Sequence, residues 1–344
     1  MKLIIKILAL IISLSCINLL AQDIGSLGQN GANIKQTGQA SMTFLQVGLV
    51  PKAAAMGDAY TALSKGVESV FFNPAGLTEM DNQFEAFVSS TQWFADIKYL
   101  AGAIGYNAGS YGSMAFSFMV VDYGQIKGTS LVPYESTGSA NYTLTGDVPN
   151  VGAYSFGLTY VKAISTKFSI GGSAKLVGQQ LGQLTHLDGS MTDNNASKLA
   201  FDLGIKYFPG IESLRLGMSI RNFSTFVQYQ SFSSPLPVLF SVGLGMNLMD
   251  VINKDVSKDH ALVLSSEFVH PNDYTDRVNT GLEYTFMNMI SVRTNYISNH
   301  DILTWSGGIG LGTSFGGTRI DIDYSYSHLR DFNAVNRFSL KVGF

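Results

Sequence analysis

The residues that could perform chemistry are few, and their spacing forms no evident centre. The five histidines could serve as general bases or zinc ligands, but they lack metal-ligand spacing: His186, His260, His270, His300 and His328. A hydrolase needs a nucleophile, a base and an orienting group, and the order of residues gives no reason to place these three together. We therefore predict no enzyme activity, no metal site and no cofactor, and expect the histidines in loops or at strand ends.

A second chemical feature is a set of cations that fall at inward or rim positions if the surrounding segments are β-strands. The set is Lys175, Arg215, Arg221 and Arg293. Such cations could form a charged constriction that selects anions. They could also be solvated lumen residues that balance Asp202, Asp321 and Asp323, and we favour this second interpretation.

The composition limits which kinds of element can position these side chains. The chain has 344 residues, of which 46% are hydrophobic and only 14% are charged. Ordinary soluble domains carry about 25% charged residues, so this chain has too few charges for a typical water-exposed surface. Its formal charge of −3 gives no basic patch that could follow phosphates, so we expect no nucleic-acid partner.

Residues 1–21 have the pattern of a secretory signal peptide. Lys2 and Lys6 precede an apolar run, and Ala21 offers a cleavage site. Polar residues interrupt the run, so it is short for a spanning helix, which needs about 20 apolar residues. The single cysteine, Cys16, could carry a lipoprotein anchor, but the surrounding lipobox is poor and we expect Cys16 to leave with the signal. The mature chain then has no disulfide and no thiolate site.

The remainder predicts an all-β fold, a transmembrane antiparallel β-barrel. An exported chain that is rich in apolar residues but has no long apolar helix can span a bilayer as a closed barrel, in which every backbone group is paired. Segments of about ten residues alternate apolar with small or polar side chains, as barrel strands do. In 111–121, for example, Met114, Phe116, Phe118 and Val120 define one apolar face.

The alternating segments number about fourteen, an even count as bacterial barrels require. They begin near residues 83, 97, 111, 151, 168, 199, 214, 237, 261, 276, 289, 304, 318 and 335. We expect long extracellular connections at 123–149 and 180–197, and short periplasmic turns such as 107–110. Trp93, Trp305 and many tyrosines are expected in interfacial girdles that contact outer-membrane lipid.

The last strand carries an expected assembly signal. Phe338, Leu340, Val342 and the terminal Phe344 alternate with polar or small residues. A terminal strand that ends in Phe resembles the signal read by the outer-membrane insertion machinery. We therefore expect the chain in the outer membrane of a Gram-negative bacterium of the Bacteroidetes type.

Residues 22–80 do not read as spanning strands. Residues 22–41 are polar and Gly-rich, and we expect a periplasmic extension there. Small residues become dense around Met56, Gly57 and Asp58, as in a plug that packs its backbone closely inside a lumen. The predicted organisation is thus a signal peptide at 1–21, an extension and lumen plug at 22–80, and a barrel at 81–344.

A short motif follows the small residues, Asn73-Pro74-Ala75-Gly76-Leu77. Together with Met56-Gly57-Asp58 and the fourteen segments, it resembles the PorV/PorQ family, which is related to FadL-type outer-membrane transporters of hydrophobic compounds. The family commonly has an acidic pair about eight residues before the motif. Here those positions hold Lys65 and Gly66, and Glu68 lies nearby.

The resemblance implies two functions. The PorV/PorQ relationship implies a component of the type IX secretion system that binds secreted cargo or attachment proteins, and we favour it at this stage. The FadL relationship implies uptake of a hydrophobic small molecule, with an apolar pocket beside the plug and a lateral exit into the bilayer. The first candidates for that pocket are Phe44, Met56, Phe71 and Phe72, although we favour simple packing of the plug against the wall for these four side chains.

Overall fold

The computed structural model describes residues 38–132, 141–185, 190–211, 213–230, 232–252, 255–300 and 302–344. The predicted signal peptide and its cleavage site lie outside these ranges. Among the described residues, no helix combines the length and the apolar character needed to cross a bilayer.

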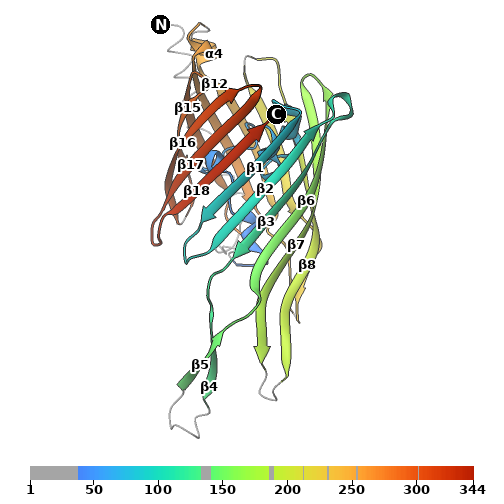
Figure 1. Ribbon diagram of the computed structural model, residues 1–344, viewed down its shortest axis with the longest axis vertical. Coiled ribbons are helices and arrows are strands. Elements are labelled where there is room, and N and C mark those ends of the chain that lie inside the picture. The colour runs from blue at the N-terminus through green and yellow to red at the C-terminus, as the bar shows by residue number, and fades with distance from the viewer. Residues whose placement is uncertain are drawn as a thin grey trace, which may run out of the picture.

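In the described part of the chain, fourteen antiparallel strands close into a barrel (Figure 1). Each strand pairs with its neighbours along the chain, and β1 pairs with β18 to close the ring. The barrel strands are β1 (Phe84–Gln92), β2 (Lys98–Asn107), β3 (Ser113–Asp122), β6 (Val151–Ser165), β7 (Phe168–Thr185), β8 (Met191–Tyr207), β9 (Arg215–Phe223), β12 (Leu239–Asn247), β13 (His260–Pro271), β14 (Arg277–Phe286), β15 (Ile290–Ile297), β16 (Leu303–Phe315), β17 (Thr318–Leu329) and β18 (Val335–Gly343).

The predicted barrel is confirmed, and thirteen of its strands begin within two residues of the expected positions. The exception is β8, which begins at Met191 instead of near 199 because β7 and β8 continue as a paired extension beyond the barrel wall. The expected long connection at 180–197 is therefore wrong over most of its length. The turn between β2 and β3 is short, as predicted, and holds a 3-10 turn, η4 (Gly109–Tyr111).

The two rims of the barrel differ. One rim carries the hairpin β4 (Lys127–Val132) and β5 (Asn141–Asp147), the β7–β8 extension, and the hairpin β10 (Val227–Tyr229) and β11 (Phe232–Ser234). We call this the long-loop rim. The opposite rim, which we call the C-terminal rim, carries Phe344, the short helix α4 (Met249–Ile252) and the turn η5 (Val256–Lys258). Figure 1 shows α4 and the C-terminus at the end of the barrel opposite β4 and β5.

Side chains alternate across the wall as expected. Met114, Phe116 and Val120 of β3 are exposed on the outside, whereas Ser113 and Ala115 face the lumen and are buried. Strand β18 follows the same rule, with Phe338 exposed and Ser339 buried. Outward apolar and inward small side chains suit a wall that meets lipid on one side and a packed lumen on the other.

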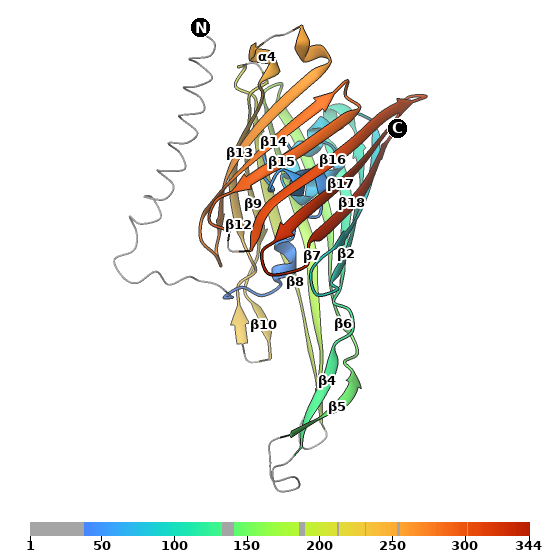
Figure 2. The same cartoon turned by 90° about the vertical axis from the view of Figure 1, so that its left-hand side faces the viewer.

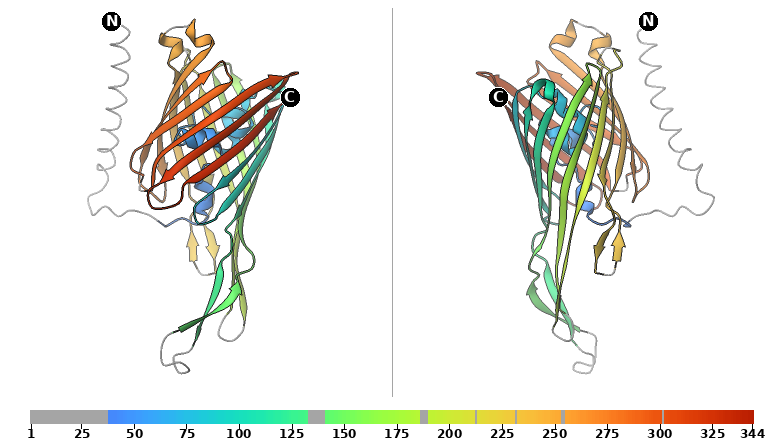
Figure 3. Two further views of the ribbon diagram at one scale, coloured as in Figure 1. Left: turned by 60° about the vertical axis from the view of Figure 1, so that its left-hand side comes forward. Right: turned by 90° about the vertical axis from the view of Figure 1, so that its right-hand side faces the viewer.

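The segment before β1 forms a plug inside the barrel, shown in blue from two sides in Figure 3. It consists of η1 (Thr43–Gln46), α2 (Pro51–Ala55), η2 (Val67–Phe71) and η3 (Pro74–Glu79). Its helices contact β6, β7 and β8 on one side and β15, β16 and β17 on the other. The plug enters beside the long-loop rim, where Ser41 N donates to Pro235 O at 2.9 Å, and leaves into β1 at the C-terminal rim.

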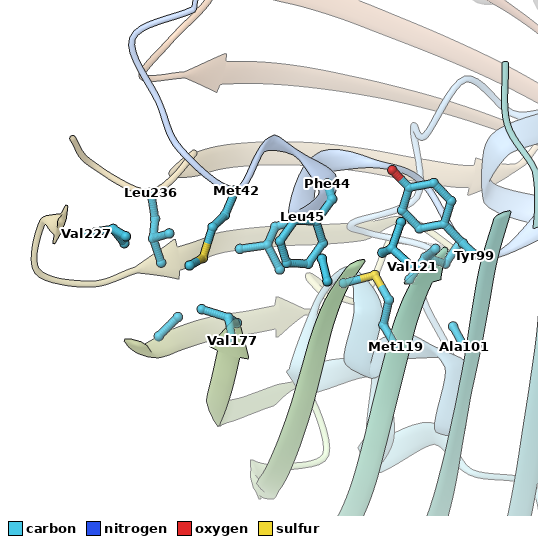
Figure 4. Packing of buried hydrophobic residues seen from close by; sticks show 13 residues of the cluster. Met42, Phe44, Leu45, Tyr99, Ala101, Met119, Val121, Val177, Val227 and Leu236 are labelled. Carbon is cyan, nitrogen blue, oxygen red and sulfur yellow. The ribbon is translucent and has the colours of Figure 1, made fainter. Parts of the chain in front are cut away.

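Two apolar clusters hold the plug. Near the long-loop rim, Phe44 and Leu45 lie toward Met119 and Val121 of β3, and Met42 lies beside Leu236, as Figure 4 shows. Deeper in the lumen, plug residues such as Val67, Phe72 and Leu77 pack with one another and with the wall. Because small inward residues leave room beside them, the plug backbone lies directly against the strands.

Candidate functional site

A cavity of about 360 Å³ lies between the plug and the wall at the long-loop rim. This is within the range of about 300–1,000 Å³ that small-molecule sites occupy. Its apolar lining is Phe44, Val47, Trp93, Phe94, Ile97, Tyr99, Tyr123, Ile297, Ile302, Leu303, Leu329 and Val335. The cavity can therefore hold an apolar molecule of modest size, and we call it the rim cavity.

The backbone pairing of the barrel wall is incomplete beside this cavity. The hydrogen-bonded ladder between β15 and β16 ends at Thr294 and Gly307. Strand β15 nevertheless continues to Ile297, paired with β14, and β16 begins at Leu303, paired with β17. The β14–β15 and β16–β17 hairpins are therefore not paired through their backbones next to the long-loop rim, and we call this break in the ladder the separation. Ile297 and Leu303, on its two sides, line the rim cavity. Figure 2 views this part of the wall, with the plug behind it.

One side chain bridges the separation. The Nδ2 of Asn295 donates to Ser306 O of β16 at 3.2 Å and to Ala55 O of the plug at 3.1 Å. A side-chain amide thus stands where a backbone bond would otherwise continue the ladder. Gly57 of the plug packs closely against the end of β15, because an added Cβ would lie 3.0 Å from Ile297 Cγ1 and 3.1 Å from Asn295 Cβ.

The opposite rim has a different character. A polar cavity of about 740 Å³ opens there, lined by charged side chains from the plug segment and from β9, β14, β15, β17 and β18. Arg293 pairs with Glu283 and Asp323, and Lys341 and Arg319 pair with Asp321. The plug lies between this charge-paired cavity, which we call the vestibule, and the largely apolar rim cavity.

The predicted cations are all used to hold structure. Lys175 pairs with Asp202 at 2.8 Å, and Arg215 lies 3.5 Å from Glu79 of the plug. Arg221 donates to Phe71 O at 2.6 Å and stacks on the ring of Phe72. Arg293 pairs with Asp323, so the expected charge balance is confirmed for Asp202 and Asp323, but Lys175 and Arg293 are largely buried and not solvated. The charges of these four cations are satisfied by plug and wall partners.

The Asn-Pro-Ala-Gly motif joins the plug to β8. Asn73 is fully buried; its Oδ1 accepts from Ala75 N at 3.1 Å, and its Nδ2 donates to Thr61 O at 3.0 Å and Ile205 O at 2.9 Å. Pro74 begins η3 with its φ already restricted. Gly76 lies where a Cβ would collide with Ser64 O. The motif is therefore a packed junction rather than an exposed turn.

A buried ion pair organises the middle of the plug. Glu68 accepts from Tyr60 Oη at 3.0 Å and pairs with Lys52. Burial opposes ionisation of Glu68, but the adjacent Lys52 ammonium and the hydrogen bonds outweigh it, so the pKa of Glu68 lies below its usual value. Glu68, which lies near the position of the acidic pair expected from the PorV/PorQ resemblance, thus connects two parts of the plug to each other.

The four predicted pocket residues do not come together. Phe44 lines the rim cavity. Met56 lies against Gly281, Phe72 packs edge-on to Tyr60, and Phe71 contacts Phe87. Of the other motif residues, Gly57 and Asp58 line the cavity.

Trp93 and Arg337 are important lining residues that the sequence analysis did not assign to the site. Trp93 was expected in an interfacial girdle, but it lines the rim cavity with Arg337 over its ring, 5.4 Å from the centroid. Arg337 also donates to Gly48 O and Ser327 Oγ at 2.8 Å. Its alternation on β18 predicts an inward side chain, but only the fold brings it to Trp93.

One stretch has the Gly-x-Ser-x-Gly spacing of hydrolases, residues 312–316. It forms the end of β16 and the turn into β17, not a strand-to-helix turn. Within the described ranges, no three His, Cys, Asp or Glu side chains gather as metal ligands would.

Comparison with solved structures finds the same architecture. The Pseudomonas putida toluene transporter TodX matches with a TM-score of 0.54 and 14% identity, over 86% of this chain and 97% of that chain. The Ralstonia pickettii toluene transporter TbuX matches with a TM-score of 0.51 and 13% identity, over 86% and 98%. A Pseudomonas aeruginosa FadL homologue matches with a TM-score of 0.51 and 11% identity, over 86% and 98%.

The chain has a FadL-like fold. At these identities the likeness concerns the fold alone. No known family and no curated protein matches the sequence. The FadL-like part of the expected resemblance is therefore confirmed in fold, whereas the PorV/PorQ branch stays a prediction.

Proposed function

We propose that this protein is an outer-membrane channel for small hydrophobic molecules. The observation that carries the proposal is the position of the apolar rim cavity beside the end of the β15–β16 ladder, with the plug closing the lumen behind it. A molecule that leaves the cavity through the wall enters the apolar bilayer. A molecule that passes the plug toward the C-terminal rim meets the charged vestibule. Two of the similar structures are toluene transporters, which supports this class of cargo.

The proposal assigns an orientation. The long-loop rim faces the outside and the C-terminal rim faces the periplasm, as in barrels with long extracellular loops and short periplasmic turns. In this orientation, the contacts of Ser41 with Ser234 and Pro235 lie on the outer side. This part of the predicted extension therefore does not fit a periplasmic position, and we replace that expectation with an outer one.

The route is tested by closing the separation between the hairpins. Tyr296 and Trp305 face outward on its two sides, so Tyr296→Cys with Trp305→Cys allows a short reducible thiol cross-linker to join them. The matched control is Val292→Cys with Ile309→Cys, which lie opposite each other where the ladder is intact. Uptake of labelled toluene into proteoliposomes is measured before cross-linking, after it, and after reduction.

We expect the cross-link at 296 and 305 to stop uptake and reduction to restore it, with the control pair unaffected. Undiminished uptake through the cross-linked 296–305 pair would overturn the lateral route. If the unmodified protein takes up no apolar probe of any kind, the channel proposal itself is overturned.

A role in handling proteins is the second candidate, and the projecting hairpins favour it. The β4–β5 hairpin and the β7–β8 extension reach well beyond the barrel (Figure 1) and expose Tyr142, Leu144 and Met191. Such surfaces suit the binding of a secreted or attachment protein. Gentle extraction of the tagged protein, followed by mass spectrometry of proteins and lipids, separates the two functions. Recovery of secretion subunits supports the second, and a lone barrel with a stoichiometric apolar molecule supports the first.

A further inference from the structure

The rim cavity is not purely apolar. Three of its lining side chains carry buried polar atoms that make no hydrogen bond with the described residues: Asp58 Oδ1, Asn279 Oδ1 and Arg277 Nε. Buried polar groups are nearly always satisfied, so three around one cavity call for an explanation. Two of these atoms accept hydrogen bonds and one donates.

Asp58 is held at the cavity by the local backbone. Its φ of 59° lies in the left-handed region, which costs energy for a residue with a Cβ. Its N–H donates to Ala53 O at 2.8 Å, which closes the turn after α2. Its carboxylate lies over Gly48, where a Cβ would approach Oδ1 to 2.6 Å. The plug thus places this carboxylate against the cavity at some conformational cost.

The other two groups come from β14. Asn279 is 2% exposed and pairs through its backbone with Ile297, beside the separation between the hairpins. Arg277 begins the same strand, two residues earlier on the same face. The second arginine of the cavity, Arg337, already has partners in Gly48 O, Ser327 Oγ and the ring of Trp93. Arg277 Nε is therefore the arginine nitrogen of this cavity that can donate a hydrogen bond to a ligand.

The unmet groups define the chemistry of a matching ligand. A hydroxyl accepts, as Arg277 Nε requires, and donates its single hydrogen to one of the two acceptors, Asp58 or Asn279. A carboxylate accepts only and would leave Asp58 and Asn279 without a donor. An ammonium group donates only and would meet Arg277, and a plain hydrocarbon would satisfy none of the three.

We infer that the rim cavity selects hydroxylated hydrocarbons, such as phenols and alkanols, over hydrocarbons of the same shape. This rests on the proposed channel function and names its substrate class. The apolar body lies against Phe44, Trp93 and Ile297, and the hydroxyl bonds to Arg277 and to one of the two acceptors. A small rotation of the Asp58 carboxylate about its soft Cβ–Cγ bond presents an oxygen to the ligand.

The test compares probes of matched shape. Binding of p-cresol, p-xylene and p-toluate to the purified full-length protein in detergent is measured by titration calorimetry. We expect p-cresol to bind at least about tenfold more tightly than p-xylene, because a polar site discriminates against a ligand that leaves its groups unpaired. We expect p-toluate to bind no better than p-xylene.

Variants assign the effect to the polar groups. Of Asp58→Ala and Asn279→Ala, the variant that removes the acceptor of the ligand hydrogen reduces p-cresol affinity about fivefold to tenfold, and both variants leave p-xylene affinity within twofold. The matched control is Asp276→Ala, whose carboxylate pairs with exposed His270 at the rim. Retention of the heat-dependent gel shift of the folded barrel verifies that each variant is folded.

The outcomes separate this inference from the channel proposal. Equal binding of p-cresol and p-xylene, or tightest binding of p-toluate, overturns the selectivity and leaves the channel standing. An unchanged preference in Asp58→Ala and in Asn279→Ala also overturns it. Failure of every probe to bind counts against the channel itself.

Discussion

The side-chain amide of Asn295 donates to the main-chain carbonyl of Ala55 at 3.1 Å, across 240 positions of sequence. The same amide also reaches Ser306 O, so one side chain holds the plug and both hairpins at the place where the β15–β16 ladder ends. This arrangement makes Asn295 a latch between plug and wall.

Removing the Asn295 amide is expected to make the ends of β15 and β16 beside the separation more mobile. In Asn295→Ala, we expect faster amide hydrogen exchange at 295–297 and 303–306, because the bridging bonds to Ala55 O and Ser306 O are lost. The matched control is Ser291→Ala, also on β15, which removes an inward hydroxyl bonded to Thr285 of β14 where the ladder is intact. Equal exchange at the separation in wild type and Asn295→Ala would show that the amide does not restrain it.

The seal made by the plug is sensitive to a single methyl group. In Gly281→Ala, the new Cβ would lie 2.6 Å from Met56 Cβ and 2.7 Å from Met56 O, so plug or wall must move. We expect raised ion conductance in planar bilayers and a lower unfolding temperature. Gly307→Ala on β16 is the control, since its Cβ would meet atoms only at 3.5 Å or more. If bilayers that contain Gly281→Ala show no increase in ion conductance, the plug adapts to the added methyl group without opening.

The junction at Asn73 is expected to dominate the attachment of the plug. Asn73→Ala removes three hydrogen bonds and leaves Thr61 O, Ile205 O and Ala75 N without this partner. The expected loss is about 2–4 kcal/mol of unfolding free energy, since buried groups left unpaired cost on the order of 1–3 kcal/mol each and the cavity relaxes in part. Denaturant titration of the refolded barrel measures it. Asn107→Ala, which removes an acceptor for Gly109 N at an exposed turn, should cost well under half as much.

The Lys52–Glu68 pair predicts an acid-sensitive plug. The folded pKa of Glu68 lies below its ordinary value of 4.5, so its contribution to stability is present above that value and is lost as the pH falls through the folded pKa. We expect the protease resistance of the plug to be constant near neutral pH and to decline below about pH 4.5.

Variants of the pair test this cause. Glu68→Gln should lower stability at neutral pH and flatten the acid decline, because it leaves the Lys52 ammonium without its partner. The double variant Lys52→Met with Glu68→Gln should recover part of the loss, since it removes the unpaired charge as well. An acid decline that is as steep in Glu68→Gln as in wild type would assign the effect to other carboxyl groups.

The barrel could be predicted from the sequence because its determinants are local. Alternation such as Met114, Phe116 and Val120 against Ser113 and Ala115 repeats every two residues, and turn residues separate the repeats. The start of β8 was misplaced because residues 191–198 are polar on both faces, and polar strands outside the bilayer lack the alternation that marks a spanning strand.

The sequence by itself determined the barrel, its approximate strand number and the presence of a plug, because each of these depends on patterns within short segments. Only the tertiary structure decided the site. It placed Phe44 in the rim cavity but Met56, Phe71 and Phe72 elsewhere, and it turned Trp93 inward against Arg337. The path of a plug through a lumen is set by contacts between residues far apart in the chain, and no local period encodes which of its side chains meets which strand.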